Sequence, residues 1–116
     1  MQIRKLTAPH CANIYELMQG IFSSLASEEY GTYRREYDGN ERKITVYCGE
    51  EYYFRNDSTL MLTAIVEETP ESVSVEIVSG GGKTGLFGIS WGAEKSAVKN
   101  IVRVLTANGF TESRAE

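Results

Sequence analysis

The chain has 116 residues, of which 41% are hydrophobic and 24% charged, and its 12 basic and 16 acidic residues give a net charge of −4. These values fit one folded domain over residues 1–116 and argue against a disordered chain or a general nucleic-acid binder. No apolar run approaches the roughly 20 residues that span a bilayer, and Met1 to Leu6 lack a signal-peptide core, so we expect a cytoplasmic protein without membrane contact.

The N-terminal segment predicts a helix from about Ala8 to Ser27. Thr7 is a typical helix N-cap, and Pro9 follows in the first turn, where its missing N–H costs no hydrogen bond. Apolar residues then recur at steps of three and four, as on one face of a helix: Cys11, Ile14, Leu17, Met18, Ile21, Phe22 and Leu25. Residues 1–6 alternate weakly, as a short strand would.

The middle of the chain is typical of strands joined by tight turns. The expected strands are residues 30–37, 42–48, 51–55, 59–67 and 72–79. Asp38-Gly39-Asn40 is a strong turn signal, and Gly49 indicates a bulge or a turn. Ile44, Val46 and Cys48 share one face of their strand.

The C-terminal part predicts a second helix, from about Gly92 to Asn108. Its apolar face is Ala97, Val98, Ile101, Val104 and Leu105. Gly109 fits the left-handed residue that ends a helix, Phe110 fits the apolar residue that often follows, and residues 111–116 read as a frayed tail. Before the helix, the alternation of residues 87, 89 and 91 suggests a short return strand.

Together these elements predict an α+β fold. The turns between the strands are short, which favours antiparallel hairpins over parallel crossovers. Two amphipathic helices need an apolar surface to cover. We therefore expect an antiparallel meander sheet of about four to six strands, with both helices packed on one face.

The glycine-rich segment is the first candidate site, for an anionic ligand held by Gly80, Gly81, Gly82, Lys83 and Thr84. Gly-Lys-Thr ends a phosphate-binding P-loop. This motif also needs a glycine five positions before Gly82, and that position holds Ile77. The glycines also match the dinucleotide pattern G-x-G-x-x-G, but no second strand with an acidic end follows. A flexible hairpin is the simpler interpretation.

Aromatic residues form the second candidate site, a surface for a partner. Tyr52 and Tyr53 belong to a tyrosine-rich stretch, and Phe87 and Trp91 belong to an apolar segment after the glycines. Interleaved arginines could stack nucleic-acid bases, but acidic neighbours dilute the positive potential, so we expect no nucleic-acid partner. Core packing is the alternative for both groups.

The cysteines and the single histidine give little sign of catalysis. Cys11 follows His10 near a predicted helix start, where a thiol can be activated, but it also fits the apolar face. Cys48 alternates with Ile44 and Val46 in the same apolar manner. No spacing of histidine and cysteine matches a metal site, so we expect no catalytic residue, metal or cofactor.

The block from Gly80 to Glu94, which leads into the last helix, resembles small bacterial domains of unknown function. The layout of helix, antiparallel strands and helix is also similar to helix-grip ligand-binding domains, which are longer and carry their glycine-rich loop earlier. The resemblance implies a bacterial source, and neither group supplies a functional residue for this chain.

Three hypotheses about function follow. The first is a non-catalytic protein-interaction or binding module, with a homodimer as one option. The second is a domain of helix-grip type that binds a small anionic or apolar ligand. The third is an enzyme that uses Cys11 or Cys48, and it is the one that the sequence supports least.

Overall fold

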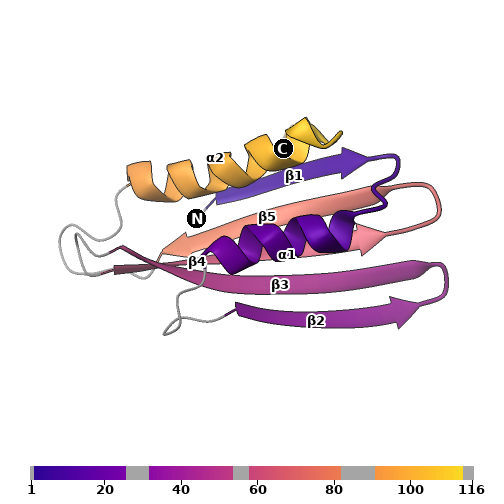
Figure 1. Ribbon diagram of the computed structural model, residues 1–116, viewed down its shortest axis with the longest axis horizontal. Helices are drawn as coiled ribbons and strands as arrows, with labels where there is room; N and C mark the ends of the chain where they lie inside the picture. The colour runs from indigo at the N-terminus through magenta and orange to yellow at the C-terminus, as the bar shows by residue number, and fades with distance from the viewer. Residues whose placement is uncertain (1, 26–31, 54–57, 82–90, 114–116) are drawn as a thin grey trace.

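The computed structural model describes residues 2–25, 32–53, 58–81 and 91–113, arranged as in Figure 1. Within these ranges the elements are β1 (Gln2–Ala8), α1 (Ile14–Leu25), β2 (Thr32–Gly39), β3 (Arg42–Tyr53), β4 (Ser58–Glu68), β5 (Val73–Gly81), α2 (Trp91–Ala107) and β6 (Thr111–Ser113). The predicted α+β class with an antiparallel sheet is confirmed.

The strands form one antiparallel sheet in the order β2-β3-β4-β5-β1-β6. β2 to β5 pair in chain order, as in a meander (Figure 1). β1 then pairs with β5, and β6 pairs with β1, so the first strand lies inside the sheet. The prediction of a plain meander is wrong at this side, and residues 111–113 of the expected frayed tail form a strand.

The first helix begins later than the sequence predicts. Leu6 and Ala8 are buried strand residues that face Val75 and Val73 of β5, so the chain stays extended to Ala8. The Asn13 carbonyl accepts the bond from the Leu17 N–H at 3.0 Å, which makes Asn13 the N-cap residue. The predicted cap at Thr7 is therefore wrong, because pairing with β5 outweighs the local helix signal.

The strand β3 continues through Gly49 without a break. Gly49 pairs with Thr32 of β2 on one side and with Leu62 of β4 on the other. The predicted bulge or turn at Gly49 is wrong, and the two strands expected around it are one strand of 12 residues. Trp91 begins α2 and does not end a strand, whereas residues 82–90 lie outside the described ranges.

The end of α2 follows the sequence prediction closely. Gly109 has a φ of 95°, a backbone conformation that L side chains rarely adopt. Its N–H donates to the Thr106 carbonyl at 3.3 Å, and the Phe110 N–H donates to the Leu105 carbonyl at 3.1 Å. This paired bonding is a Schellman motif, and it turns Phe110 into the core, where 4% of the side chain is exposed.

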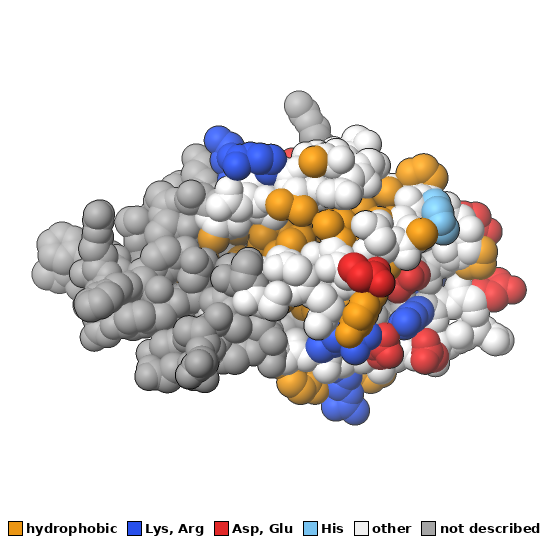
Figure 2. Space-filling model, viewed as in Figure 1, with side chains coloured by type: hydrophobic (Ala, Val, Ile, Leu, Met, Phe, Trp, Pro, Cys, Tyr) orange, Lys and Arg blue, Asp and Glu red, His pale blue; other side chains and the backbone are white. Residues whose placement is uncertain are grey.

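Both helices pack on the same face of the sheet, as predicted. Buried side chains from α1, α2 and the strands form a single apolar cluster. α1 lies on β3, while α2 lies on β1, β5 and β6. Figure 2 looks onto this side and shows apolar side chains in the strip between the helices. Leu17 and Ile21 are partly buried and pack against the cluster.

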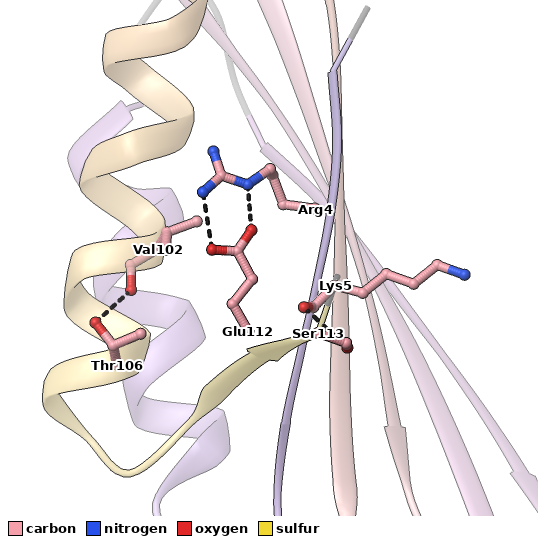
Figure 3. Close-up of polar contacts among 6 residues, drawn as sticks. All are labelled: Arg4, Lys5, Val102, Thr106, Glu112 and Ser113. Carbon is pink, nitrogen blue, oxygen red and sulfur yellow. Dashed lines mark hydrogen bonds and ion pairs between the residues drawn. The ribbon is translucent and has the colours of Figure 1, made fainter. Parts of the chain in front are cut away.

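The two faces of the sheet separate clearly at β1 and β6. On the helix side, the Arg4 guanidinium donates to both carboxylate oxygens of Glu112, with the Nη2 to Oε1 distance at 2.8 Å (Figure 3). Lys5, the next residue, points to the opposite side in the same view. The Ser113 hydroxyl donates to the Lys5 carbonyl at 3.3 Å and adds a second tie between these strands.

Candidate functional site

Among the described residues, the face of the sheet on which neither helix packs is the candidate site, and we call it the uncovered face. It consists of alternate strand residues: the odd-numbered ones in 3–7, 33–37, 61–67 and 111–113, and the even-numbered ones in 42–50 and 74–80. Each of these residues is exposed or half-buried, whereas the alternate positions of β4 and β5 are mostly buried. The uncovered face is thus a surface made by all six strands.

The strand β3 carries its aliphatic side chains on the uncovered face. Ile44, Val46 and Cys48 point there, and each is half-buried among its neighbours. The helix side of the same strand presents Thr45 and Tyr47. An antiparallel sheet with one solvent-exposed face normally has the opposite arrangement, with apolar residues toward the core and polar residues toward water. The aliphatic face of β3 therefore points away from the core.

Tyr47 explains how β3 fits against α1 with so few aliphatic residues on its helix side. The Tyr47 ring stacks on Phe22 of α1, with the ring centroids 5.6 Å apart. It lies opposite Ala64 of β4, whose small side chain leaves space for the ring. The Arg34 guanidinium lies 4.7 Å from the Tyr15 ring centroid and 5.9 Å from that of Tyr47. This aromatic cluster fixes which face of β3 is inward.

Two apolar cross-strand pairs lie on the uncovered face, and we call them together the apolar band. Ile3 of β1 is opposite Val78 of β5, and Val46 of β3 is opposite Ile65 of β4. Four large side chains on this face are about half exposed: Ile3 (43%), Met61 (47%), Tyr33 (54%) and Tyr37 (52%). Thr63 lies opposite Val78 and Glu76 lies opposite Ile65, so polar side chains separate the two pairs. Exposed apolar side chains that gather on one face mark an interaction site more often than scattered ones do.

The charges of the uncovered face balance one another. Its described residues include three cations, Lys5, Arg35 and Arg42, and three carboxylates, Glu50, Glu67 and Glu76. Two oppositely charged pairs lie within the face, Arg42 with Glu67 at 2.8 Å and Lys5 with Glu76 at 3.9 Å. The chain as a whole carries a net charge of −4, so this face is more neutral than the rest of the protein.

At the β2 edge of the uncovered face, a charged side chain lies beside aromatic rings. The Arg35 guanidinium lies 5.3 Å from the Tyr37 ring centroid, and a hydrogen bond to Tyr33 raises the pKa of Arg35 above its ordinary value. Both tyrosines stay half exposed. Arginine and tyrosine are the residue types that carry much of the binding energy in protein interfaces.

The residues chosen from the sequence fall largely outside the described structure. Gly80 and Gly81 lie at the end of β5, and a Cβ at Gly80 would meet no described atom within 4 Å. Gly82, Lys83, Thr84 and Phe87 belong to residues that the structure does not describe. Tyr52 and Tyr53 end β3, and Trp91 begins α2, but their side chains are not described. The ligand site and the aromatic surface stay predictions.

The two cysteines lie on opposite sides of the sheet, and neither is disulfide-bonded. Cys11 is buried at the start of α1, and burial raises the pKa of its thiol above the ordinary value. A nucleophilic cysteine needs a lowered pKa, so this environment counts against Cys11 as a nucleophile. Cys48 is half-buried on the uncovered face, with its sulfur 3.8 Å from the Thr63 hydroxyl.

Other candidate sites in the described ranges are weak. No three His, Cys, Asp or Glu side chains among the described residues are grouped to hold a metal ion. Neither described helix is long and apolar enough to cross a membrane. A cleft of about 350 Å³ lies between two hairpin turns, at residues 39–42 and 69–71, and it holds charges of both signs. These observations leave the uncovered face as the strongest candidate.

Comparison with known proteins supports the predicted resemblance to a domain of unknown function. The model of a family of unknown function, DUF6054, matches residues 5–109. No curated protein and no solved structure matches the chain. The matched range contains both helices, the strands β2 to β5 and the second half of β1, so most of the uncovered face lies within it.

Proposed function

The chain belongs to this family of unknown function, DUF6054, and from the geometry of its sheet we propose that it is a non-catalytic protein-interaction module. Its contact surface is the uncovered face. The helix side completes the protein's own core, and the uncovered face is available to a partner. This proposal makes specific the interaction hypothesis that the sequence suggests.

The distribution of side chains on β3 is the observation that carries the proposal. Ile44, Val46 and Cys48 would be a conventional core face, yet they point away from the helices. Exposed β-branched side chains give a lone domain little stability and add a risk of aggregation. A partner that covers them gives these residues a role, because it removes their apolar surface from water.

The proposal places the protein in a reducing compartment, the bacterial cytoplasm. Both cysteines are free, and because they lie on opposite sides of the sheet they cannot join each other without rearrangement of the fold. Free thiols of this kind are typical of proteins kept in a reducing environment.

The test is the reactivity of Cys48 inside cells. Its thiol lies on the uncovered face, so a bound partner would shield it from a cell-permeant maleimide. Ile65→Gln is the control variant, because Ile65 lies in the apolar band and a buried glutamine side chain would weaken the contact. The buried Cys11 is the internal reference for an intact fold.

We expect Cys48 in the wild-type protein to react at least about tenfold more slowly than Cys48 in Ile65→Gln, in the same cells and at matched expression. Cys11 should stay unreactive in both proteins. Equal rates for Cys48 in the two proteins would show that nothing covers the face, and the proposed function would be wrong.

A further inference from the structure

We propose that the partner which covers the uncovered face is a second copy of this chain, related by a two-fold axis. The inference rests on the proposed function, and it adds the identity of the partner. A two-fold interface uses the same patch on both subunits, so that patch must be complementary to itself in area, charge and shape. The uncovered face meets these three conditions.

The area of the uncovered face is close to that of a standard dimer interface. Strands lie about 4.8 Å apart and rise about 3.3 Å per residue, so the five longer strands, β1 to β5, at about eight residues each, cover roughly 600 Å² of plane. The accessible surface of projecting side chains is larger than this flat projection. It therefore approaches the roughly 800 Å² per partner of a standard protein interface.

The charge pattern favours a copy of the same chain over a strongly charged partner. Two protein molecules that each carry a net charge of −4 repel each other unless they meet where the charge is balanced. The described residues of the uncovered face hold three cations and three carboxylates. Two of the cations already pair with carboxylates of the same face in the same chain. A nucleic acid or a basic peptide would meet no net opposite charge there.

The shape also suits a second sheet. Alternating side chains of two facing sheets interdigitate in a layer about 10 Å thick. The central residues of the face, Val46, Ile65 and Val78, are of the β-branched type that packs well on a pleated surface. The dimer would have two central sheets with helices on both outer sides.

Within the described sheet β2 is an edge strand, and its outer edge is the competing surface for self-association. It carries charged side chains at Arg34, Glu36 and Asp38, and Glu36 is already engaged by Arg34 and by Lys43, whose Nζ lies 3.0 Å from Oε2. Charged residues on an edge strand are a common protection against edge-to-edge pairing. This edge is therefore a poorer contact than the uncovered face.

Sedimentation equilibrium of the purified protein tests the inference. The wild-type protein, Ile65→Lys and Gln19→Lys are compared from about 1 to 100 µM, where a specific dimer is populated. Gln19 is exposed on α1, so Gln19→Lys adds the same charge on the opposite side of the molecule. Ile3→Lys serves as a second disrupting variant, since Ile3 is 43% exposed and its replacement spares the core. Circular dichroism verifies that each variant is folded.

We expect a dimer for the wild-type protein and Gln19→Lys, and a dissociation constant raised at least about 100-fold in Ile65→Lys, because the interface would have to take the lysine charge out of water. A wild-type monomer at 100 µM would overturn the inference. If Cys48 were still shielded in cells, that result would leave the proposed function standing with a different partner. A dimer that survives both Ile65→Lys and Ile3→Lys would equally overturn it and would point to the β2 edge.

Discussion

The two faces of the sheet differ in what completes them. The helix side is closed within one chain, where Leu62, Val75 and Ile77 are buried beneath α1 and α2. The uncovered face presents Ile44, Val46 and Ile65, which are of the same chemical type and are only half-buried. Two apolar faces on one sheet show that hydrophobic patterning by itself does not identify the core. Which face becomes the core depends on the elements that pack on it.

The largest expected difference between the two faces is in the stability cost of replacing an isoleucine on each of them. Ile77 is fully buried on the helix side, and Ile65 of the neighbouring strand is half-buried on the uncovered face. Ile77→Ala should lower the free energy of unfolding by about 2–5 kcal/mol at every protein concentration. Ile65→Ala should cost less in dilute protein and more at high concentration, where the dimer forms.

Urea titrations at low and high protein concentration measure both costs. If Ile65→Ala destabilised dilute protein as strongly as Ile77→Ala, the two faces would be equivalent parts of one core. The comparison would then fail.

The second prediction concerns Gly109, which directs Phe110 into the helix-side core. Because the φ of Gly109 is 95°, Gly109→Ala should destabilise the protein by about 1–2 kcal/mol. Gly20 lies inside α1, where a Cβ would meet no described atom within 4 Å, so Gly20→Ala should stabilise by about 0.5–1 kcal/mol. Thermal melts that move both variants in the same direction would contradict the assigned cap.

The third prediction compares one ion pair from each face. Arg4 lowers the pKa of Glu112 on the helix side, chiefly by a hydrogen bond. The folded state thus favours the carboxylate, and its contribution to stability is complete above pH 4.5 and is lost as the pH falls through the lowered pKa. Glu112→Gln should lower the stability at pH 7 and weaken the stability loss on acidification.

Glu76→Gln is the matched change on the uncovered face, where Lys5 and Glu76 are 3.9 Å apart and more exposed. Its effect in dilute protein should stay below about 0.5–1 kcal/mol. Unfolding curves at pH 7 compare the two variants in dilute protein. An equal loss of stability would mean that the helix-side pair has no special role.

Much of the fold could be predicted from the sequence, because local signals there agree with the final packing. The alternation in β5 gives Val73, Val75 and Ile77 their buried face, and Gly109 with Phe110 marks the end of α2. The predictions fail where contacts with residues distant in the sequence determine the local structure. Thr7 looks like a helix cap but belongs to β1, since the strand partners come from residues 73–79 and 111–113.

The candidate site could not be predicted for a related reason. The apolar alternation of Ile44, Val46 and Cys48 is the same whether the residues face a helix or a partner. The signal that assigns the faces of β3 is Tyr47, which needs Phe22 of α1 and the small Ala64 of β4 as neighbours. Those neighbours are 25 and 17 residues away in the sequence, so only the tertiary structure reveals them.

The most direct test of the account is the rate at which Cys48 of the purified protein reacts with a maleimide, measured against protein concentration. We predict that the rate falls at least about tenfold as the dimer forms, that it stays constant in Ile65→Gln, and that Cys11 is unreactive throughout. A wild-type rate that does not change from about 1 to 100 µM would contradict the assignment of the uncovered face as an interface between two copies of the chain.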